Sequence, residues 1–588
     1  MNKPSPAIIA QSAVRRLPRW ALWLFCLAYM LPGFIGRGPW KNEDIAAFGV
    51  MHELTSTAAN WLQPQLLGHV TGFDALIPYW LGALAIQSLP FLDPALAVRF
   101  PFVMLLALTL LTTWYAIYYL ARSPQAQPVA FAFGGEANPV DYARAIADAG
   151  VLALIASLGL AQFSHETTPA LAQLGFTALA FYAMAASPYR RATTVIGPAL
   201  GLLAGLVGLA LSGAPTLALL LGTGGALIES LCLRWGHLKA DAVSNQRSRQ
   251  WAVLIAVTTL LAALLSLALD LWRWRIELPG AGGQSAWNDW RNLGRLLLWF
   301  TWPAWPLALW TLWRWRRQLT SRHVALPLWF ASMAVISALT TTASDRSLLL
   351  SLPPLAALAA FALPTLQRSV ASLIDWFTLL FFTGCAIVIW VIWIAMQTGV
   401  PRQPAANVAK LAPGFEPSFS LIAFVTAVAA TLAWAWLVRW RTGAHRAAIW
   451  KSLVLPAGGA TLCWLLLMTL WLPLLDYARS LAPLSRQVAS LVDKSACVEI
   501  YGVDSAQAAA LQYHGRLDLR QATPQASCPY LVVDVNAQPS LSSAVNLPDW
   551  AFQATVRKPT DKTENMLVFK RVSLDAPASP SATPPVTR

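Results

Sequence analysis

The chain has 588 residues, of which 57% are hydrophobic, 12% are charged and 29 are tryptophan. Soluble domains are about 25% charged, so this composition excludes a soluble, disordered or disulfide-dense secreted protein and leaves a polytopic membrane protein. The net charge of +15 does not indicate nucleic-acid binding, because the basic residues stand between apolar runs rather than on one soluble face.

The first apolar run covers residues 20–36 and follows Arg15, Arg16 and Arg19. It resembles a secretory signal peptide, but no small-residue cleavage site follows at the right distance, so we expect an uncleaved first span. A spanning helix needs roughly 20 apolar residues. By that measure the sequence predicts about thirteen spans, at 20–36, 97–120, 146–162, 170–186, 195–211, 215–232, 251–270, 294–312, 324–342, 348–365, 374–396, 418–438 and 452–473.

The apolar stretch 76–92 is not counted as a span, because counting it would move every later loop to the opposite side of the membrane and remove the asymmetry of basic residues described next. Without it, 21 of the 42 Lys and Arg residues lie on the side of the N-terminus, ten on the opposite side and eleven in the C-terminal region. Basic residues concentrate on the cytoplasmic side of membrane proteins. We therefore expect a multi-pass protein of the bacterial inner membrane with a cytoplasmic N-terminus and an interfacial or re-entrant helix at 76–92.

The first outer loop, residues 37–96, is long and polar and rich in Trp and Pro. Asn42 is a suitable helix N-cap, and Glu43 and Asp44 follow it in the first turn. These acids either only complement the helix dipole or form a reactive carboxylate site at the membrane surface beside Lys41 and Arg37. Further along the same loop are three more candidate site residues, His52, Glu53 and His69.

A second polar site lies in the short outer loop between the third and fourth spans, where His165 and Glu166 stand on the same membrane face as Asp44. They are either two solvated residues at a helix end or part of the site in the first loop. A divalent metal bound by His165, Glu166 and first-loop residues is a further hypothesis, although the sequence shows no ligand spacing for it.

The charge density changes near Asp476, because residues 1–476 are about 10% charged and residues 477–588 about 18%. We interpret 1–476 as the transmembrane domain, 477–572 as a periplasmic α/β domain, and the Pro/Ala/Ser/Thr-rich 573–588 as a disordered tail. Within the α/β domain the pattern predicts strands at 497–503, 530–535 and 565–571 and a helix at 505–513.

The fold class is therefore an all-α polytopic membrane protein with a small C-terminal α/β soluble domain. With an odd number of spans and a cytoplasmic N-terminus, that domain is expected on the periplasmic side of the membrane. Cys497 and Cys528 are its two cysteines. They either form a disulfide, as an oxidising compartment permits, or remain two buried thiols.

The order of features in the first half of the chain resembles the polytopic glycosyltransferases with the GT-C fold, in particular the bacterial branch of aminoarabinose transferase and the protein O-mannosyltransferases. The first-loop features that carry this resemblance are Gly36-Arg37, Trp40, Glu43-Asp44, His52-Glu53-Leu54, the segment 61–68, Tyr79-Trp80 and Arg99. Two later segments, 343–347 followed by 350–354 and 302–306, are similar to family segments as well. Two features depart from the family: the acidic pair reads Glu-Asp, and the lysine of the family's Glu-Lys-Pro-Pro segment is absent from 73–78.

The resemblance implies an enzyme that moves a sugar from a polyprenyl-phosphate donor to a lipid, glycan or protein acceptor at the outer face of the membrane. It implies Asp44 as the base, with Glu43 as its alternate or partner. It implies Arg346 as the clamp of the donor phosphate, assisted by Lys41 or Arg37. Arg346 has a simpler interpretation as a partner of Asp345 or as a lone surface residue. Further possible substrate contacts are His52, Glu53, His69, Tyr79, His165 and Glu166.

Two other functions remain open from the sequence. A secondary transporter would favour charged residues within spans and inverted repeats, whereas Glu229, Asp270 and Asp375 lie near span ends. An O-antigen ligase or polymerase also uses polyprenyl carriers, but it would carry its chemistry in a large late loop, and the late outer loop here, 397–417, is short.

Overall fold

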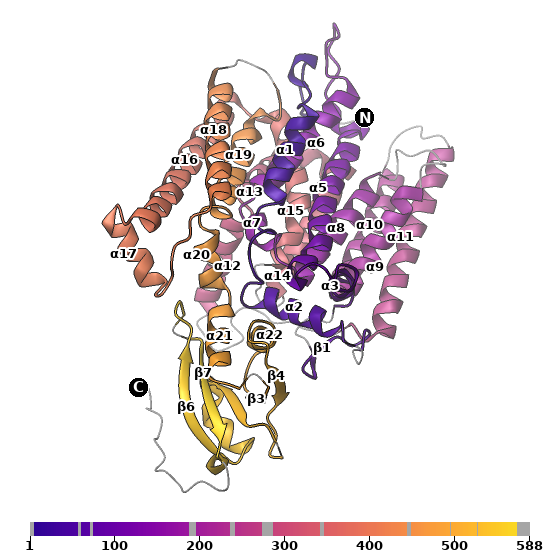
Figure 1. The fold of residues 1–588 in the computed structure, drawn as a ribbon. Helices are drawn as coiled ribbons and strands as arrows, with labels where there is room; N and C mark the ends of the chain where they lie inside the picture. The colour runs from indigo at the N-terminus through magenta and orange to yellow at the C-terminus, as the bar shows by residue number, and fades with distance from the viewer. Residues whose placement is uncertain are drawn as a thin grey trace.

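The computed structural model describes residues 5–56, 60–70, 75–186, 196–235, 242–272, 286–340, 346–443, 448–493, 495–525, 527–561 and 563–572. A bundle of long helices forms most of the molecule, and a small mixed sheet with one helix stands at one end of it (Figure 1). The start of α1 (Arg19–Met30) lies at the end of the bundle opposite the sheet. The chain therefore enters the bundle at one end and leaves it at the other.

Each of the thirteen expected spans falls on helical structure. The bundle helices are α1, α5 (Arg99–Ala121), α6 (Pro139–Ala156), α8 (Pro169–Ala186), α9 (Ile196–Leu211), α10 (Pro215–Trp235), α11 (Ala242–Ala268), α12 (Ala286–Phe300), α13 (Ala304–Arg314), α14 (Arg322–Thr340), α15 (Leu352–Ala362), α16 (Arg368–Thr398), α18 (Leu421–Gly443) and α19 (Lys451–Leu467).

Among the described residues, seven helices are long and apolar enough to cross a membrane, and α19 with α20 (Leu472–Arg479), bent by 70°, could make an eighth. The helices at Arg19–Met30, Ile196–Leu211 and Pro215–Leu231 are apolar but shorter. These helices make the protein a polytopic membrane protein, and the number thirteen stays a prediction.

Two stretches differ from a simple alternation of spans. The stretch expected as one span at 294–312 is broken between α12 and α13, because Pro303 has no N–H to continue a helix and restricts the residue before it. The stretch at 76–92 forms α3 (Ile77–Ser88), a 12-residue helix. At 1.5 Å per residue α3 is about 18 Å long, short of the roughly 30 Å hydrocarbon core. Because α1, an expected span, also has 12 residues, this length does not distinguish a span from an interfacial helix, and the expectation that 76–92 does not span stays a prediction.

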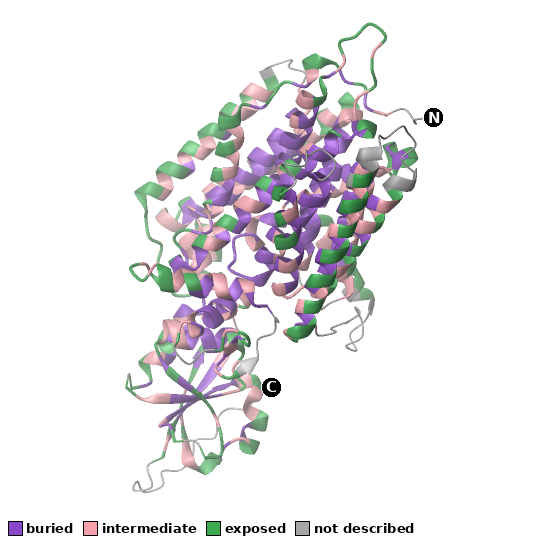
Figure 2. Cartoon of the chain, turned by 90° about the vertical axis from the view of Figure 1, so that its right-hand side faces the viewer, coloured by how far each residue is buried: buried purple, intermediate pink, exposed green. Residues whose placement is uncertain are grey.

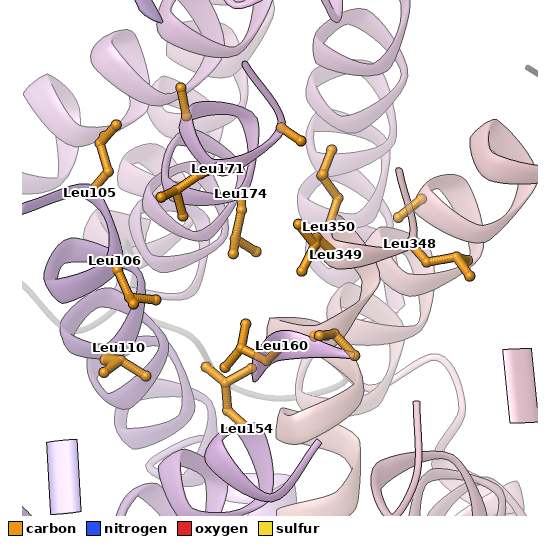
Figure 3. Close-up of a cluster of buried hydrophobic side chains, with 14 of the residues drawn as sticks. Leu105, Leu106, Leu110, Leu154, Leu160, Leu171, Leu174, Leu348, Leu349 and Leu350 are labelled. Atoms are coloured by element: carbon orange, nitrogen blue, oxygen red, sulfur yellow. The ribbon is translucent and has the colours of Figure 1, made fainter. Parts of the chain in front are cut away.

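Buried residues fill the middle of the bundle, and exposed ones lie on its outer faces (Figure 2). A leucine cluster joins α5, α6 and α8 to the short helices α7 (Leu160–Phe163) and η6 (Ser347–Ser351). Figure 3 labels its members Leu105, Leu106, Leu110, Leu154, Leu160, Leu171, Leu174, Leu348, Leu349 and Leu350. Close packing rather than the hydrophobic effect joins helices within a membrane. This packing fixes the loop after α7 beside the start of η6.

The C-terminal domain is a five-stranded sheet in the order β4-β3-β5-β7-β6, with β3 parallel to β4 and β5 and the remaining pairs antiparallel. Its elements are β3 (Cys497–Tyr501), α22 (Ser505–His514), β4 (Asp518–Gln521), β5 (Tyr530–Asp534), β6 (Trp550–Arg557) and β7 (Asn565–Arg571). The sequence predicts three of these strands and the helix but not β4 and β6. A disulfide joins Cys497 to Cys528, which resolves the two alternatives for these cysteines.

The C-terminal domain packs directly on the first outer loop. Helix α22 lies against α2 (Glu43–Glu53), and a Cβ added at Gly49 would stand 2.5 Å from the Cβ of Ala509. The Phe48 and Tyr513 rings are 4.7 Å apart between centroids. The Tyr513 hydroxyl donates a hydrogen bond of 3.0 Å to Asp93, just before α4 (Pro94–Ala97). The outer domain is thus fixed to the helix that carries the acidic pair.

Candidate functional site

Helix α2 begins at Glu43, as the sequence predicts. Asn42 stands at the N-cap position with φ of 68° and ψ of −125°, a backbone conformation that is rare for residues other than glycine, and its side chain makes no capping hydrogen bond. The turn is fixed by the Lys41 N–H, which donates to the Arg479 carbonyl at 2.7 Å. Asn42 therefore occupies the expected N-cap position, but its side chain does not cap the helix. A backbone contact from α20 holds this turn instead.

Asp44 is the buried member of the acidic pair, with 2% of its side chain exposed. One carboxylate oxygen accepts hydrogen bonds from Arg37 Nη1 at 2.9 Å and the Trp40 N–H at 3.0 Å. The other accepts from the N–H and the hydroxyl of Thr167 at 2.7 and 2.8 Å. Asp44 therefore joins the start of α2 to the loop before α8.

Arg37 is as buried as its partner, with 2% of its side chain exposed. Its Nε donates to the Gly33 carbonyl and its Nη2 to the His165 carbonyl, both at 2.6 Å. The guanidinium also stands 4.3 Å from the centre of the Trp40 ring. Because its nitrogens are hydrogen-bonded within the protein, Arg37 holds Asp44 and the loop of His165 in one arrangement.

Burial acts on two titratable groups of this region in different ways. Burial alone would raise the pKa of Asp44, but the Arg37 charge and the N–H groups of Trp40 and Thr167 bring it below its ordinary value. Burial lowers the pKa of His165 to about 4. The neutral His165 ring can donate from Nε2 to the Tyr29 carbonyl at 3.0 Å. Asp44 is thus an anion and His165 a neutral ring at physiological pH.

Arg346 lies at the more open side of the same region and bridges two carboxylates. Its Nη2 is 2.7 Å and its Nε 2.8 Å from Glu166 Oε2, and its Nη1 is 3.2 Å from Glu43 Oε1. The guanidinium carbon also stands 5.0 Å from the Phe163 ring centre. The side chain of Glu43 is 28% exposed and that of Glu166 is 3% exposed. We call Arg37, Glu43, Asp44, Glu166 and Arg346 the inner cluster.

Burial and the neighbouring charges both shift the pKa values of the Glu166–Arg346 pair. Burial raises the pKa of Glu166 above its ordinary value, against the opposing effect of Arg346. Burial alone would lower the pKa of Arg346, but Glu166 and Glu43 raise it. Asp345, the partner that a simpler interpretation gives to Arg346, lies outside the described residues. Arg346 is therefore a cation held between acids from two other segments.

Lys41 points away from the inner cluster toward the C-terminal domain. Its Nζ is 2.9 Å from Asp561 and 3.2 Å from Glu564, and Lys558 Nζ is 3.0 Å from the other oxygen of Glu564. Burial alone would lower the pKa of Lys41, but Asp561 and Glu564 raise it. We call these four residues the junction cluster. The role of Lys41 as an assistant at the donor phosphate stays a prediction.

The remaining candidates lie along α2 and after it. His52 stacks on Phe48 with the ring centres 5.9 Å apart, and burial lowers its pKa. Glu53 accepts the Leu67 N–H at 2.9 Å. His69 is in β2 (His69–Val70), which pairs with β1 (Gln65–Leu66), and Tyr79 is buried on α3. His52 also stands 6.1 Å from the Tyr513 ring of α22, so His52 and Glu53 join α2 to its neighbours, and the four residues stay predictions as substrate contacts.

Three residues at the site have no signal in the sequence. Thr167 provides two of the hydrogen bonds to Asp44. Asp476 accepts from the Gly38 N–H and from Trp40 Nε1, both at 3.0 Å, and Arg479 stands 5.3 Å from the Trp40 ring centre. Asp476 and Arg479 lie on α20, more than 430 positions after Gly38, so only the tertiary structure brings them here.

The hypothesis of a metal at His165 and Glu166 finds no ligand set in the described part of the chain, where no group of three or more His, Cys, Asp or Glu side chains could hold an ion. His165 uses its ring nitrogens within the fold, since Nε2 contacts the Tyr29 carbonyl and Nδ1 lies 3.2 Å from Ser164 Oγ. Its ring also packs on Trp464, with 4.7 Å between the ring centres. His165 is therefore part of the wall behind Arg37.

Comparison with known proteins gives structural matches only. No family model matches the chain, and no curated protein matches it. Two structures of ArnT from Cupriavidus metallidurans, one bound to undecaprenyl phosphate and one in the apo state, match with a TM-score of 0.58 and 14% sequence identity. The match covers 95% of this chain and 98% of ArnT.

A weaker match is the archaeal oligosaccharyltransferase AglB from Archaeoglobus fulgidus in complex with an inhibitory peptide and a dolichol-phosphate. Its TM-score is 0.44 at 10% identity, covering 95% of this chain and 74% of AglB. The likeness to ArnT extends over nearly the whole of both chains. It confirms the expected fold, a GT-C-like helical membrane domain with a small C-terminal α/β domain.

Proposed function

We propose that this protein is a membrane glycosyltransferase that takes a sugar from a polyprenyl-phosphate donor and transfers it to a lipid, glycan or protein hydroxyl. The observation that carries the proposal is the inner cluster. A half-open pair, Glu43 and Arg346, stands over a buried pair, Arg37 and Asp44, in a chain that shares its fold with ArnT. ArnT itself has been seen with undecaprenyl phosphate.

Glu43 is the better candidate for the carboxylate that accepts the proton of the acceptor hydroxyl. A general base must come within hydrogen-bond reach of that proton. The Glu43 side chain is 28% exposed, whereas Asp44 is 2% exposed and accepts four hydrogen bonds. On this proposal Asp44 is a positioning residue that holds α2 through Arg37, in place of the base that the sequence favours.

Arg346 is the candidate for the residue that binds the donor phosphate. A guanidinium presents a planar fork that fits two phosphate oxygens as well as it fits two carboxylates. In the structure Glu166 and Glu43 contact that fork. A bound phosphate would compete with Glu43, the more exposed of the two, and would release that carboxylate toward the acceptor. Arg37 would then support the site from behind through its pair with Asp44, whereas an assisting role of Lys41 would require it to leave Asp561 and Glu564.

The site is proposed to face the periplasm from the inner membrane. The asymmetry of basic residues supports a cytoplasmic N-terminus. The C-terminal domain stands at the other end of the bundle and carries a disulfide, which persists in oxidising compartments. We retain the division into a transmembrane domain at 1–476, a periplasmic domain at 477–572 and a tail at 573–588 as part of this proposal.

The rival functions find less support in the structure. Two of the acids near span ends have cationic partners, since Glu229 is 2.7 Å from Arg322 and Asp375 pairs with Arg441. Within the late outer loop, α17 (Arg402–Leu411) has no buried residue. A transporter or a ligase-type enzyme would need its chemistry in one of these places.

The test is sugar transfer from a purified polyprenyl-phosphate sugar by the full chain in detergent. We expect Arg346→Ala to lower the rate strongly or to raise the donor requirement, and Arg346→Lys to keep part of the activity, because an ammonium keeps the charge but not the fork. Arg402→Ala, on exposed α17, is the matched control. Equal activity of Arg346→Ala and wild type at limiting donor would remove Arg346 from the site.

A further inference from the structure

A cavity of about 580 Å³ lies between α1, α18 and α19, toward the end of the bundle opposite the C-terminal domain. Its volume is within the range of about 300–1,000 Å³ that ligand cavities have. The wall is mostly apolar. Two of its lining residues, Trp20 and Trp436, are 67% and 59% exposed, so the cavity opens sideways on the face of the bundle that lipid would cover.

Small residues form part of the cavity wall, alongside larger apolar side chains. Ala429, Ala430 and Ala433 line it from α18 and Gly458 from α19. At Gly458 the two helices touch, because an added Cβ would stand 2.6 Å from Leu437. A flexible hydrocarbon chain fits such an uneven apolar wall better than a rigid ring does, because it can bend around the larger side chains.

The charges at the cavity are basic and lie at one end. Arg15, Arg16 and Lys451 line it, and none of its described lining residues is acidic. Arg16 is paired with Asp141 at 2.8 Å, whereas Arg15 has no ion pair with a described residue. The backbone of Arg15 is fixed, because Trp450 Nε1 donates to its carbonyl at 2.7 Å. Arg15 is thus an exposed cation held at the mouth of an apolar cavity.

Aromatic residues surround the same mouth. Trp440 and Trp450 stack with their ring centres 6.3 Å apart, and Lys451 Nζ stands 5.9 Å from the Trp440 ring centre. Tryptophans gather at the level of lipid headgroups, and basic pockets between spans on the cytoplasmic side recognise anionic headgroups. The mouth of the cavity is therefore at headgroup depth and the wall at acyl-chain depth.

We propose that this cavity is a binding site for an anionic phospholipid of the leaflet on the N-terminal side. One acyl chain lies between α1, α18 and α19, and the headgroup phosphate lies against Arg15 and Lys451. The basic mouth selects an anionic lipid over a zwitterionic one. The site is separate from the inner cluster and does not depend on the proposed transfer reaction.

The experiment is native mass spectrometry of the full-length protein released from detergent micelles containing phosphatidylglycerol or phosphatidylcholine of the same chain length. We expect phosphatidylglycerol to be retained more strongly by about fivefold for each basic residue that contacts it. Arg15→Gln should reduce that preference, and Ala433→Phe, which fills the cavity, should reduce retention of both lipids. Arg368→Gln is the matched control, because Arg368 is an exposed arginine at the same end of the bundle that does not line the cavity.

Three outcomes would overturn the proposal. The first is equal retention of the two lipids by wild type, and the second is unchanged retention of phosphatidylglycerol by both Arg15→Gln and Ala433→Phe. The third is displacement of phosphatidylglycerol by an equal amount of undecaprenyl phosphate, which would assign the cavity to the carrier lipid. The Ala433→Phe variant leaves every charge in place, so loss of lipid in that variant tests the cavity itself.

Discussion

The Arg37–Asp44 pair of the inner cluster and the Lys41–Asp561 pair of the junction cluster start from neighbouring residues and reach different environments. Arg37 and Asp44 are each 2% exposed, whereas Lys41 is 31% and Asp561 26% exposed. Charges in a buried pair lose their hydration and depend on each other, whereas a pair in contact with water contributes only about 0–1 kcal/mol. The same kind of ion pair therefore sets the shape of the site where it is buried and supports a domain contact where it meets water.

The largest effect is expected at the open side of the inner cluster. Glu43→Gln should lower the rate of sugar transfer by about 10²–10⁴, the usual contribution of a general base. The fold should persist, because the substituted residue keeps its size, and the start of α2 loses only a dipole interaction and one partly exposed ion pair with Arg346. Turnover with saturating donor measures this effect. A rate within a factor of two of wild type would return the role of base to Asp44.

Removing one charge of the buried pair should affect stability more than chemistry. Arg37→Met leaves Asp44 buried without its cation, which we expect to destabilise the protein by about 3–5 kcal/mol. Thermal unfolding followed by tryptophan fluorescence measures the loss. The double variant Arg37→Met with Asp44→Asn should regain part of it. A double variant as unstable as the single one would show that Arg37 acts through its bonds to Gly33 and His165 instead.

The corresponding change in the junction cluster should be mild. Lys41→Met should lower stability by about 0–1 kcal/mol, because the pair is in contact with solvent. The effect should fade at high salt, which screens exposed pairs. If Lys41→Met were as destabilising as Arg37→Met, the difference between the two clusters would be lost. A large fall in donor affinity without a change in stability would instead support the sequence-based role of Lys41 at the phosphate.

Acid should weaken the contact between the C-terminal domain and the first loop through His514, the last residue of α22, where a Cβ added at Gly38 would stand 3.8 Å from the His514 ring. Burial and the charge of Arg486 lower the pKa of His514 to about 4 in the folded protein, against about 6.5 in an unfolded chain. The unfolded state therefore binds more protons between these values, and stability should fall as the pH drops from about 6.5 toward 4. Thermal midpoints of wild type and His514→Gln across this range measure the effect. The variant should lose less stability on acidification than wild type, and parallel curves would contradict the assignment.

The sequence predicts the parts of the site that depend on local pattern. The acidic pair at the start of α2 and the polar loop at His165 follow from helix signals and from the spacing of apolar runs. The contacts that decide the roles of these residues cannot be predicted from such local patterns. Nothing local indicates that Asp44 is covered by Thr167 or that Asp476 reaches Trp40, because those partners meet only through tertiary packing.

The sequence predicts the fold to a similar extent. Long apolar runs identify the spans, but the break between α12 and α13 depends on how Pro303 is accommodated within a stretch that is apolar throughout. In the outer domain β4 has only four residues, and β6 alternates exposed and half-buried residues at the edge of the sheet, so neither has an apolar run to reveal it. The sequence left the Cys497–Cys528 disulfide undecided, because a separation of 31 positions does not indicate how close the two cysteines lie in the fold.

The contacts between Gly38–Lys41 and the end of the chain have a consequence for how the protein is made. The residues that hold this turn are 436 to 520 positions further along, on α20 and in the loop before β7. At about 5–20 residues per second, a ribosome needs roughly 25–100 s to travel 520 positions. Through that interval the nascent first loop lacks the segments that hold it. The site is therefore completed only after α20 and the C-terminal domain have been made, and a chain terminated before them would lack these contacts.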